Sequence, residues 1–439
     1  PPTRICLFCP HRTPNKLVAI LISVSTTHTS TMSLTPETIE IIRATAPVVA
    51  PKALEITRAF YPKMFAANPE VLRYFNSSNQ RDARQPRALA DAVLAFASHI
   101  DHLDVITPAV SRMVQKHCAL FVQPADYHIV HRHLMAAIAE VLGDAVTPAV
   151  GAAWSEAVMF LAGLLIKEEE ALYSQVENAP GGWRGKRAFR VAAVTPETPR
   201  AVSLWLEPVD GGEVVQHLPG QYITVAENPT SAAYCAPRHY TVTSPPSSKG
   251  YRITPRAHPP AADGHHPAGV MSTFLHSRQV GDVVHLHPPF GAAVFPLDEA
   301  SANQRPGVFI SSGIGVTPVV AMARVAAAHR PCLAIFHADS SPATFALRAE
   351  LQACLSAAPG VSFMVEKFSS AGERLDAGVI VDGLCAHGLA LDCVDIFIST
   401  NADQLLVFAR GLAALGVPVR NIHFELFGPH LELNCDTAA

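Results

Sequence analysis

The sequence predicts a multidomain protein with an all-α domain first, an antiparallel β-barrel second, and an α/β domain with a doubly wound parallel sheet last. Three observations lead to this prediction. The chain has 439 residues, which is more than the roughly 250 to 300 that a single hydrophobic core serves. Its hydrophobic period changes twice, and a Pro-Gly-Gly stretch at 180–182 interrupts any helix at the first change.

The first region has a helical period. Thr35 can cap a helix, Pro36 suits the first helical position, and Glu37 complements the helix dipole. Apolar residues then recur at spacings of three and four as far as Tyr173, without the alternation that is typical of strands. We therefore expect an all-α domain over residues 32–178.

The next two regions are distinguished by their strands. After the break at 177–187, short alternating runs such as "QYITVAE", "RHYTVTS" and "GDVVHLH" are separated by Gly, Pro and Ser, which predicts an antiparallel barrel over 184–298. From Pro306, continuous apolar runs such as "GVFIS" and "VDIFIS" alternate with helical segments. This pattern is typical of a doubly wound parallel sheet, which we assign to 305–439.

Composition limits the classes of function. The chain is 49% hydrophobic and 16% charged with a net charge of −4, so it has no basic excess for a nucleic-acid partner. Nine scattered cysteines with one CxxC indicate reduced thiols in an intracellular protein. The apolar run at 17–24 is too short to cross a bilayer, so we expect no stable membrane insertion.

Residues 1–31 stand apart from the rest, because they contain no acidic residue and are rich in Ser and Thr. They are either upstream sequence before Met32 or an organelle transit peptide, and we favour the first interpretation. We expect a cytoplasmic protein, or a mitochondrial one if the segment is a transit peptide.

Nucleotide chemistry is indicated in the last two domains. In "FISSGIGVTP", Gly313 and Gly315 follow a buried strand and precede a helix, so backbone NH groups can meet a pyrophosphate, although a plain tight turn has the same sequence. In "RHYTVTS", a cation, a flat aromatic ring and a hydroxyl suit a flavin nucleotide. The motifs "LPGQY" and "GVMSTFLH" add an aromatic ring and a helix start with small residues. Together these motifs resemble the ferredoxin-reductase family.

His117 raises a separate question. It lies on an apolar helical stripe with Val110, Met113 and Val114, so it is either a core residue or a metal ligand. Upstream residues favour the role of metal ligand for His117, because they offer an aromatic wall and hydrogen-bonding side chains. A single imidazole facing such a wall is what a haem pocket with an open sixth position needs. The upstream residues are Tyr61, Phe75, Gln85 and Leu89.

Residues 33–439 resemble the flavohaemoglobins, in which a globin is fused to a flavin and nicotinamide reductase. The resemblance implies a globin haem domain over 32–178, an FAD barrel over 184–298 and an NAD(P) domain over 305–439, with haem b, FAD and NAD(P)H as cofactors. By motif, "QKH" makes His117 the proximal iron ligand with Lys116 beside it. "FYPKMF" makes Tyr61 the distal hydroxyl, "NQRDARQ" makes Gln85 its companion, and "ADYHIV" makes Tyr127 the proximal tyrosine.

The same resemblance assigns nucleotide ligands from "GQY", "RHYT", "GVMS", "GIGVTP" and "FELFGP". For FAD they are Tyr222, Arg238, His239, Tyr240, Thr241, Gly269, Ser272, Glu425, Phe427, Gly428 and Pro429. For the nicotinamide nucleotide they are Gly313, Ile314, Gly315, Val316, Thr317, Pro318 and Ser399.

Three positions depart from the family pattern. The proximal glutamate of the family falls on Ala171, and either Glu169 or Glu170 is expected to replace it. Pro62 follows Tyr61 inside a helix and is expected to kink it. The family motif Cys-Gly-Pro at the end of a nucleotide-domain strand is replaced by the residues at 399–401, Ser-Thr-Asn.

The resemblance implies nitric oxide dioxygenase activity, in which NO and O2 become nitrate at haem with electrons from NAD(P)H through FAD. The partners would then be small molecules, and we expect a monomer. Two alternatives remain open: reduction of hydroperoxides with the same electrons, and a gas-binding sensor or store whose reductase is impaired. A lipid in the haem pocket also remains open.

Overall fold

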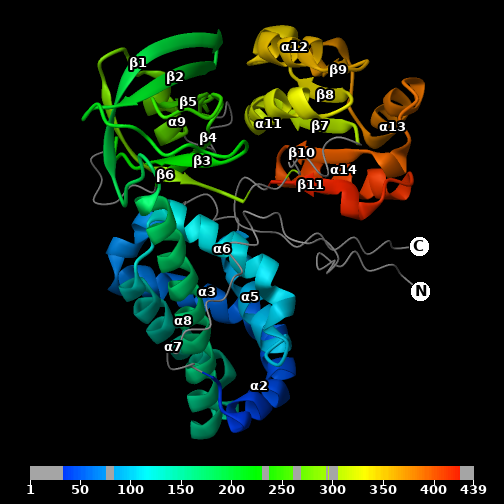
Figure 1. The fold of residues 1–439 in the computed structure, drawn as a ribbon. Coiled ribbons are helices and arrows are strands. Elements are labelled where there is room, and N and C mark those ends of the chain that lie inside the picture. The colour runs from blue at the N-terminus through cyan, green and yellow to red at the C-terminus, as the bar shows by residue number, and fades with distance from the viewer. Residues whose placement is uncertain are drawn as a thin grey trace.

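The computed structural model describes residues 33–75, 84–229, 237–260, 268–292, 295 and 305–425. A helical domain occupies one end of the molecule, and two sheet domains lie side by side at the other end (Figure 1). The first sheet is antiparallel and the second is parallel. The predicted fold class is therefore confirmed. The predicted residues Phe427, Gly428 and Pro429 lie outside the described residues, as does the segment 1–31.

The helical domain is built from long helices linked by short 3₁₀ turns. Its elements are α2 (Pro36–Val49), η1 (Ala50–Lys52), α3 (Ala53–Ala67), η2 (Pro69–Tyr74), α5 (Arg84–Ser98), η3 (Leu103–Ile106), α6 (Thr107–Leu120), α7 (Pro124–Leu142), η4 (Gly143–Ala145) and α8 (Pro148–Asn178). The Thr35 side chain accepts a hydrogen bond of 3.1 Å from the Thr38 amide, so it caps α2 as predicted. Helix α3 continues through Pro62 to Ala67, so that proline does not end the helix, and the predicted kink stays a prediction.

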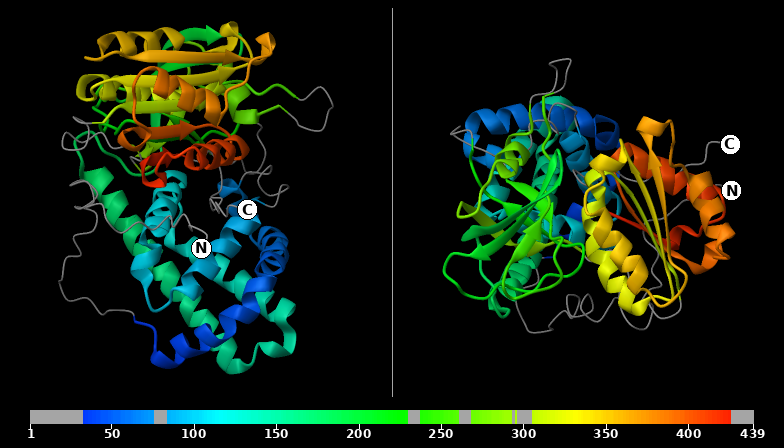
Figure 2. Two further views of the ribbon diagram at one scale, coloured as in Figure 1. Left: turned by 90° about the vertical axis from the view of Figure 1, so that its right-hand side faces the viewer. Right: turned by 90° about the horizontal axis from the view of Figure 1, so that it is seen from above.

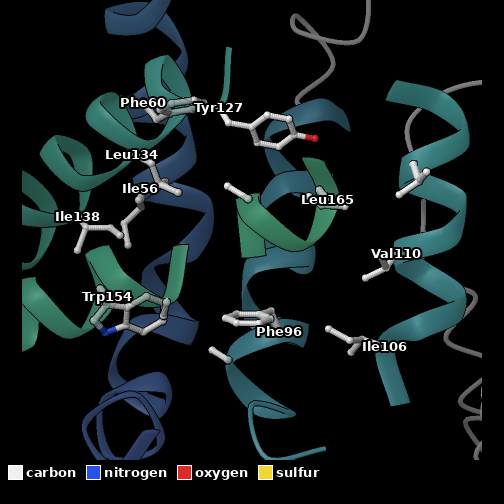
Figure 3. Packing of buried hydrophobic residues seen from close by; sticks show 14 of the residues in the cluster. Ile56, Phe60, Phe96, Ile106, Val110, Tyr127, Leu134, Ile138, Trp154 and Leu165 are labelled. Carbon is white, nitrogen blue, oxygen red and sulfur yellow. The ribbon is translucent and has the colours of Figure 1, made fainter. Parts of the chain in front are cut away.

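One apolar core joins these helices. Ile56 and Phe60 of α3, Leu134 of α7 and Trp154 of α8 all belong to it and are nearly inaccessible to solvent. Figure 3 shows these side chains meeting between the helices. Because this core extends along α6 as well, the helix that carries His117 is held by the same packing as the helix that carries Tyr61.

Helix α8 is the one helix among the described residues that is long and apolar enough, by length and composition, to cross a membrane. A core helix of a folded domain passes the same test. Here α8 packs against α2, α6 and α7, and its stripe facing them includes Trp154, Leu165, Glu169 and Tyr173. The long apolar face therefore belongs to the core of the helical domain.

The second domain contains β1 (Arg187–Thr198), β2 (Ala201–Pro208), β3 (Tyr222–Val225), β4 (Arg238–Thr241), β5 (Tyr251–Ile253), α9 (Val270–His276) and β6 (Val283–Phe290). The strand order is β4-β3-β6-β1-β2-β5, and every pairing is antiparallel. An antiparallel bridge between Val242 and Ile253 joins the two ends of this order. The sheet therefore closes on itself as a barrel, and a separate apolar core fills it.

The third domain contains β7 (Gly307–Ser312), η5 (Gly313–Gly315), α11 (Val316–His329), β8 (Leu333–Asp339), η6 (Pro342–Thr344), α12 (Arg348–Ala357), β9 (Phe363–Phe368), η7 (Ser369–Ala371), α13 (Ala377–Ala386), η8 (Leu391–Cys393), β10 (Asp395–Ser399), α14 (Ala402–Ala414), η9 (Val419–Asn421) and β11 (Ile422–Phe424). All pairings in the order β11-β10-β7-β8-β9 are parallel. Two cores cover opposite faces of the sheet, with α11 and α12 on one and α13 and α14 on the other, as Figure 2 also shows. Ligands of such sheets bind beyond the carboxyl ends of the strands.

Helix α6, which carries His117, is docked directly on the barrel. His287 Nδ1 of β6 donates a hydrogen bond of 2.8 Å to the carbonyl of Ala119, and the Gly291 amide donates one of 2.9 Å to Gln115 Oε1. The Phe121 ring, at the end of α6, lies 5.6 Å from the His287 ring. The helical domain and the barrel therefore meet along the last turns of α6, on both sides of His117.

This junction should weaken as the pH falls. Burial lowers the pKa of His287 to about 4, whereas an unfolded histidine titrates near 6.5. Between these values the unfolded chain binds more protons, so stability decreases as pH falls from about 6.5 to about 4, by up to about 1.4 kcal/mol per pH unit for this group. We expect His287→Asn, which keeps a donor toward Ala119, to lose less stability than wild type between pH 7 and pH 5 in urea unfolding. Equal losses would assign the pH dependence to other groups.

The two sheet domains are joined by a charged cluster. Glu350 of α12 accepts hydrogen bonds of 2.6 and 2.8 Å from Arg252 of β5, and it also pairs with Arg324 of α11. Both guanidinium groups donate to the carbonyl of Thr243 as well, at 2.9 and 3.0 Å. Ala201 of β2 belongs to the core of the third domain. These contacts fix the edge of the barrel against the first crossover of the parallel sheet.

Candidate functional site

His117 is at the centre of a hydrogen-bonded network on α6, α7 and α8. Its Nδ1 lies 2.8 Å from Glu169 Oε1 and 2.9 Å from the Tyr127 hydroxyl, and Tyr127 also donates to Glu169 Oε1. A carboxylate only accepts hydrogen bonds, so Nδ1 donates to Glu169 and Nε2 keeps its lone pair. Burial, followed by the Glu169 charge, raises the pKa of Tyr127, so its hydroxyl stays protonated. The network fixes the orientation and tautomer of the imidazole.

The environment of His117 fits an iron ligand better than a core residue. Its side chain is 33% exposed although Glu169, its partner, is 3% exposed, and Val114 and Cys118 on the same helix are buried. In the described part of the chain, no group of three or more His, Cys, Asp or Glu side chains could hold a metal. A single oriented imidazole with a carboxylate behind it is the donor set that haem iron takes.

The structure distinguishes the two candidate glutamates. Glu169 is buried in the network with His117, whereas Glu170 is exposed and pairs with Arg184. The Glu170 hydrogen bonds, chiefly those from Arg184, lower its pKa. Glu169 therefore occupies the position behind the imidazole, and Ala171 takes no part in this network.

The distal candidates form an aromatic cluster. The Tyr61 ring lies 5.6 Å from the rings of both Phe65 and Phe75, and Phe65 and Phe75 lie 5.1 Å apart. Tyr61 is 5% exposed, and burial raises the pKa of its hydroxyl, which keeps the proton that it would donate. Gln85 and Leu89 lie one turn apart on α5, which packs against α3.

The predicted flavin residues are gathered where β3 and β4 pair. Tyr222 lies opposite Thr241 and beside the His239 ring, at 4.8 Å, while Arg238 and Tyr240 alternate with His239 and Thr241 along β4. Thr241 is buried, and among the described residues its Oγ1 has no hydrogen-bond partner. An unpartnered buried hydroxyl across the strand pair from an aromatic side chain fits a polar ring system such as a flavin.

Other predicted flavin residues make local contacts. His239 Nδ1 is 2.8 Å from Thr224 Oγ1, across the strand pair. Gly269 precedes the short helix α9, and Ser272 Oγ donates a hydrogen bond of 3.1 Å back to its carbonyl. These contacts account for His239 and Ser272 without a ligand, so their assignment to FAD stays a prediction.

Lys116 and Glu425 lie between the haem and flavin candidates. Burial raises the pKa of Glu425 to about 7, and the nearby charge of Lys116 opposes this increase. Among the described residues, Glu425 Oε2 has no hydrogen-bond partner although it is inaccessible. Lys116 precedes His117 on α6, and Glu425 follows the end of β11, so this pair brings the third domain close to the helix that carries His117.

The glycine turn lies at the carboxyl end of β7. Gly313 has φ +50°, and a Cβ on it would lie 2.8 Å from Arg256 Nη1, while a Cβ on Gly315 would lie 2.3 Å from the Ser399 carbonyl oxygen. Glycine is therefore required at Gly315 by close packing, apart from any ligand. Ser399 Oγ is buried and, in the described chain, without a partner. The other predicted residues form η5 and the first turn of α11: Ile314, Val316, Thr317 and Pro318.

The residues at 399–401 lead from the end of β10 into α14. Asn401 caps α14, because its side chain accepts a hydrogen bond of 3.0 Å from the Gln404 amide. Thr400 Oγ1 donates one of 2.6 Å to Gln404 Oε1, which also accepts one of 2.8 Å from Ser312 Oγ. A polar cluster therefore fixes this turn between the ends of β7 and β10.

Comparison with known proteins identifies the family. The globin family matches residues 58–164. A flavohemoprotein of Halalkalibacterium halodurans is 34% identical over 409 residues, which cover 91% of this chain and 98% of the relative. The chain belongs to the flavohemoprotein family. Flavohemoprotein A of Dictyostelium discoideum is 36% identical over 410 residues, covering 91% of this chain and 99% of the relative.

A solved structure agrees with this assignment. The flavohemoglobin of Malassezia yamatoensis, determined with bound FAD and heme, superposes with a TM-score of 0.76 at 28% identity, covering 90% of this chain and 100% of that one. The predicted family is thus confirmed.

Three side chains near the candidate nucleotide site of this flavohemoprotein were not predicted from the sequence. Arg256 reaches the glycine turn from the barrel, and Ser312 and Gln404 complete the cluster at the end of β10. Gln404 had a local signal, because it lies three residues after the helix cap Asn401. Arg256 had none, since an arginine a few residues after a strand is an ordinary surface residue until the neighbouring domain is placed.

Proposed function

We propose that this flavohemoprotein binds haem, FAD and NAD(P)H and acts as a nitric oxide dioxygenase, converting NO and O2 to nitrate. The observation that carries the proposal is the network in which Glu169 and Tyr127 hold His117. When bound, FAD converts the two-electron hydride of NAD(P)H into single electrons, and haem iron supplies the place where O2 and NO react.

The side chains support oxidative chemistry more than simple gas storage. A carboxylate behind the imidazole makes His117 a more basic ligand, which favours an oxidised iron. Tyr61 is protonated and can donate a hydrogen bond on the distal side, where negative charge would develop. The Thr241 and Ser399 hydroxyls, which have no hydrogen-bond partner among the described residues, lie in the two nucleotide domains, as ligands of FAD and NAD(P)H would.

The proposal is tested by NO consumption. The full chain, purified with its cofactors, is expected to remove NO only when both NAD(P)H and O2 are present, and to form nitrate in equal amount. Nucleotide-driven reduction of an organic hydroperoxide that is faster than the consumption of NO would favour the hydroperoxide reductase. A stable gas-bound spectrum that NADH cannot regenerate would favour a sensor or store. Either result would overturn the dioxygenase proposal.

Tyr61→Phe should keep both haem and FAD but weaken O2 binding. One neutral hydrogen bond contributes about 0.5 to 1.5 kcal/mol, which corresponds to roughly two- to tenfold in affinity. We expect the O2 dissociation rate to increase by that factor. Tyr74→Phe is the matched control, because the Tyr74 hydroxyl donates to Asp126, at 2.7 Å. An unchanged dissociation rate in Tyr61→Phe would show that the hydroxyl does not reach the ligand.

A further inference from the structure

Glu350 joins elements of both sheet domains. Its carboxylate accepts hydrogen bonds of 2.6 and 2.8 Å from Arg252 of the barrel, in the two-point geometry that a guanidinium offers, and it pairs with Arg324 of the third domain at the same time. These three side chains are between 21% and 29% exposed. One carboxylate therefore compensates two cations at the domain boundary, at a place that water reaches only in part.

The barrel holds Arg252 in a fixed orientation. Arg252 Nε donates a hydrogen bond of 3.0 Å to Thr243 Oγ1, and Nη2 donates one of 2.9 Å to the Thr243 carbonyl. The Thr243 hydroxyl contacts that of Thr254 at 3.1 Å, and Thr254 contacts Ser203 Oγ at 3.0 Å. All three hydroxyl-bearing residues are buried. The barrel therefore presents the guanidinium to Glu350 as a preorganised fork.

The cluster lies between the strand of the predicted flavin residues and the helix that follows the glycine turn. Thr243 comes shortly after β4, which ends at Thr241, and Arg324 lies on α11, which begins at Val316. Arg324 Nη1 donates a hydrogen bond of 3.0 Å to the Thr243 carbonyl. The same contacts therefore fix α11 against the end of β4, and with them the two predicted nucleotide sites against each other.

The charge of Glu350 decides the sign of this contact. Arg252 and Arg324 both donate to the Thr243 carbonyl, so their guanidinium groups are close together, and two like charges at short distance repel each other. Solvent screens part of the repulsion, because the groups are partly exposed. With Glu350 between them, the arginines hold the two domains together, and without it they favour separation.

Hydride transfer is the step that depends most on this alignment. In the proposed function, a C–H bond of the dihydronicotinamide breaks, and the hydride passes with its two electrons to the flavin. The nucleotide is oxidised to NAD(P)+, the flavin is reduced, and water supplies the proton that completes FADH2. Donor and acceptor are bound by different domains, so a shift of α11 against β4 changes their separation. A misplacement near 1 Å can cost on the order of 100-fold in rate.

We propose that Glu350 is a positioning residue for hydride transfer, which aligns the nucleotide of the third domain with the flavin of the barrel by holding Arg252 and Arg324 together. This proposal rests on the proposed use of FAD and NAD(P)H but not on NO consumption. Because Glu350 acts through the two arginines, its loss should reduce the rate of the step and leave the affinity for the nucleotide largely unchanged.

Anaerobic stopped-flow on the full chain, loaded with haem and FAD, measures these two quantities separately for NADH and for NADPH. Glu350→Gln should reduce the limiting rate of flavin reduction by about ten- to a hundredfold, with a similar half-saturating concentration. Glu366→Gln is the matched control. Glu366 accepts hydrogen bonds of 2.7 and 2.6 Å from Arg348 in the same two-point geometry, but both residues belong to the third domain. This control should change neither quantity.

Amide hydrogen exchange measures the docking of the domains without turnover. Ala201 is a barrel residue packed into the apolar core of the third domain, and its amide donates a hydrogen bond of 2.9 Å to Thr198 Oγ1. Glu350→Gln should exchange faster than wild type at residues 201–202, and Glu366→Gln should not. Raising the salt concentration should slow flavin reduction more in wild type than in Glu350→Gln, because salt screens the cluster that only wild type retains.

Three results would overturn the proposal. Equal limiting rates in wild type and Glu350→Gln would show that the cluster does not set the alignment. A loss of nucleotide affinity with an unchanged limiting rate would place Glu350 in nucleotide binding. A slower rate without faster exchange at 201–202 would show that Glu350 does not act through domain docking.

Two further outcomes are also decisive. If Glu350→Gln does not fold, Arg324→Gln carries the test, because it removes one arm of the same cluster from a side chain that is 27% exposed. An unchanged limiting rate in that variant would contradict the proposal. If neither nucleotide reduces the flavin of wild type, the proposed use of NAD(P)H fails, and not this assignment alone.

Discussion

His117→Ala is expected to purify with a full content of FAD and almost no haem. The imidazole is the iron ligand of the proposed haem site, and Glu169 and Tyr127 hold its orientation by hydrogen bonds. Most of the predicted flavin residues lie on the barrel, which has an apolar core of its own, although Tyr222 and Phe290 of the barrel also join the core of the helical domain. Loss of one cofactor should therefore leave the other bound. The Soret band measures haem, and flavin released by denaturation measures FAD.

A matched histidine controls for this substitution. His131 lies on α7 in the same domain and makes one hydrogen bond of 2.8 Å, between Nε2 and Ser155 Oγ. His131→Ala should keep both cofactors. Full haem content in His117→Ala would mean that His117 is a core residue and that another group binds the iron. Loss of both cofactors would mean that the two domains do not fold independently.

The fold was predictable because each domain has its own hydrophobic period. Alternate residues of β7 enter opposite cores, with Phe309 on one face and Val308 and Ile310 on the other. A strand covered by helices on both faces must be apolar throughout, and that run was visible in "GVFIS". The barrel strands instead alternate, because one face meets the barrel core and the other meets solvent or a neighbouring domain.

The choice between Glu169 and Glu170 could not be made from the sequence alone. Glu169 and Glu170 are adjacent, so their side chains point about 100° apart on a helix. Glu169 shares a stripe with Leu165, Leu172 and Tyr173, at spacings of four, three and four, and all are buried. That stripe favoured Glu169. Whether the stripe faces His117, however, depends on how α8 packs against α6, and the sequence of either helix alone does not determine this packing.

Contacts between domains could not be predicted from the sequence, for a related reason. Arg256 and Gly313 are distant in the chain, and nothing near either residue indicates the other. The contact arises only when the barrel edge meets the end of β7. The hydrogen bond from His287 to Ala119 could not be predicted either, because it joins a strand of the barrel to a helix of the first domain.

Flavin reduction by NAD(P)H is expected to be slow and to limit turnover, and restoration of Cys-Gly-Pro at 399–401 should accelerate it at least several-fold. Thr400 is 2% exposed and sits at the end of β10, where the family has glycine. Its side chain is tied to Gln404, so its bulk cannot move away easily. Hydride transfer depends on placement, and an error near 1 Å can reduce a rate by on the order of 100-fold.

The polar cluster also supports an intact reductase, because it fixes a turn of its own. Single substitutions distinguish slow flavin reduction from fast flavin reduction. Asn401 already makes a well-formed turn by capping α14, so Asn401→Pro alone should remove a cap contribution of about 1 kcal/mol and gain little rate. Thr400→Gly alone should provide most of the acceleration, because it removes the β-branched side chain next to Ser312. Anaerobic stopped-flow at the flavin band decides between them. If the native chain is reduced as fast as the Cys-Gly-Pro variant, the cluster is a neutral replacement and the reductase is intact.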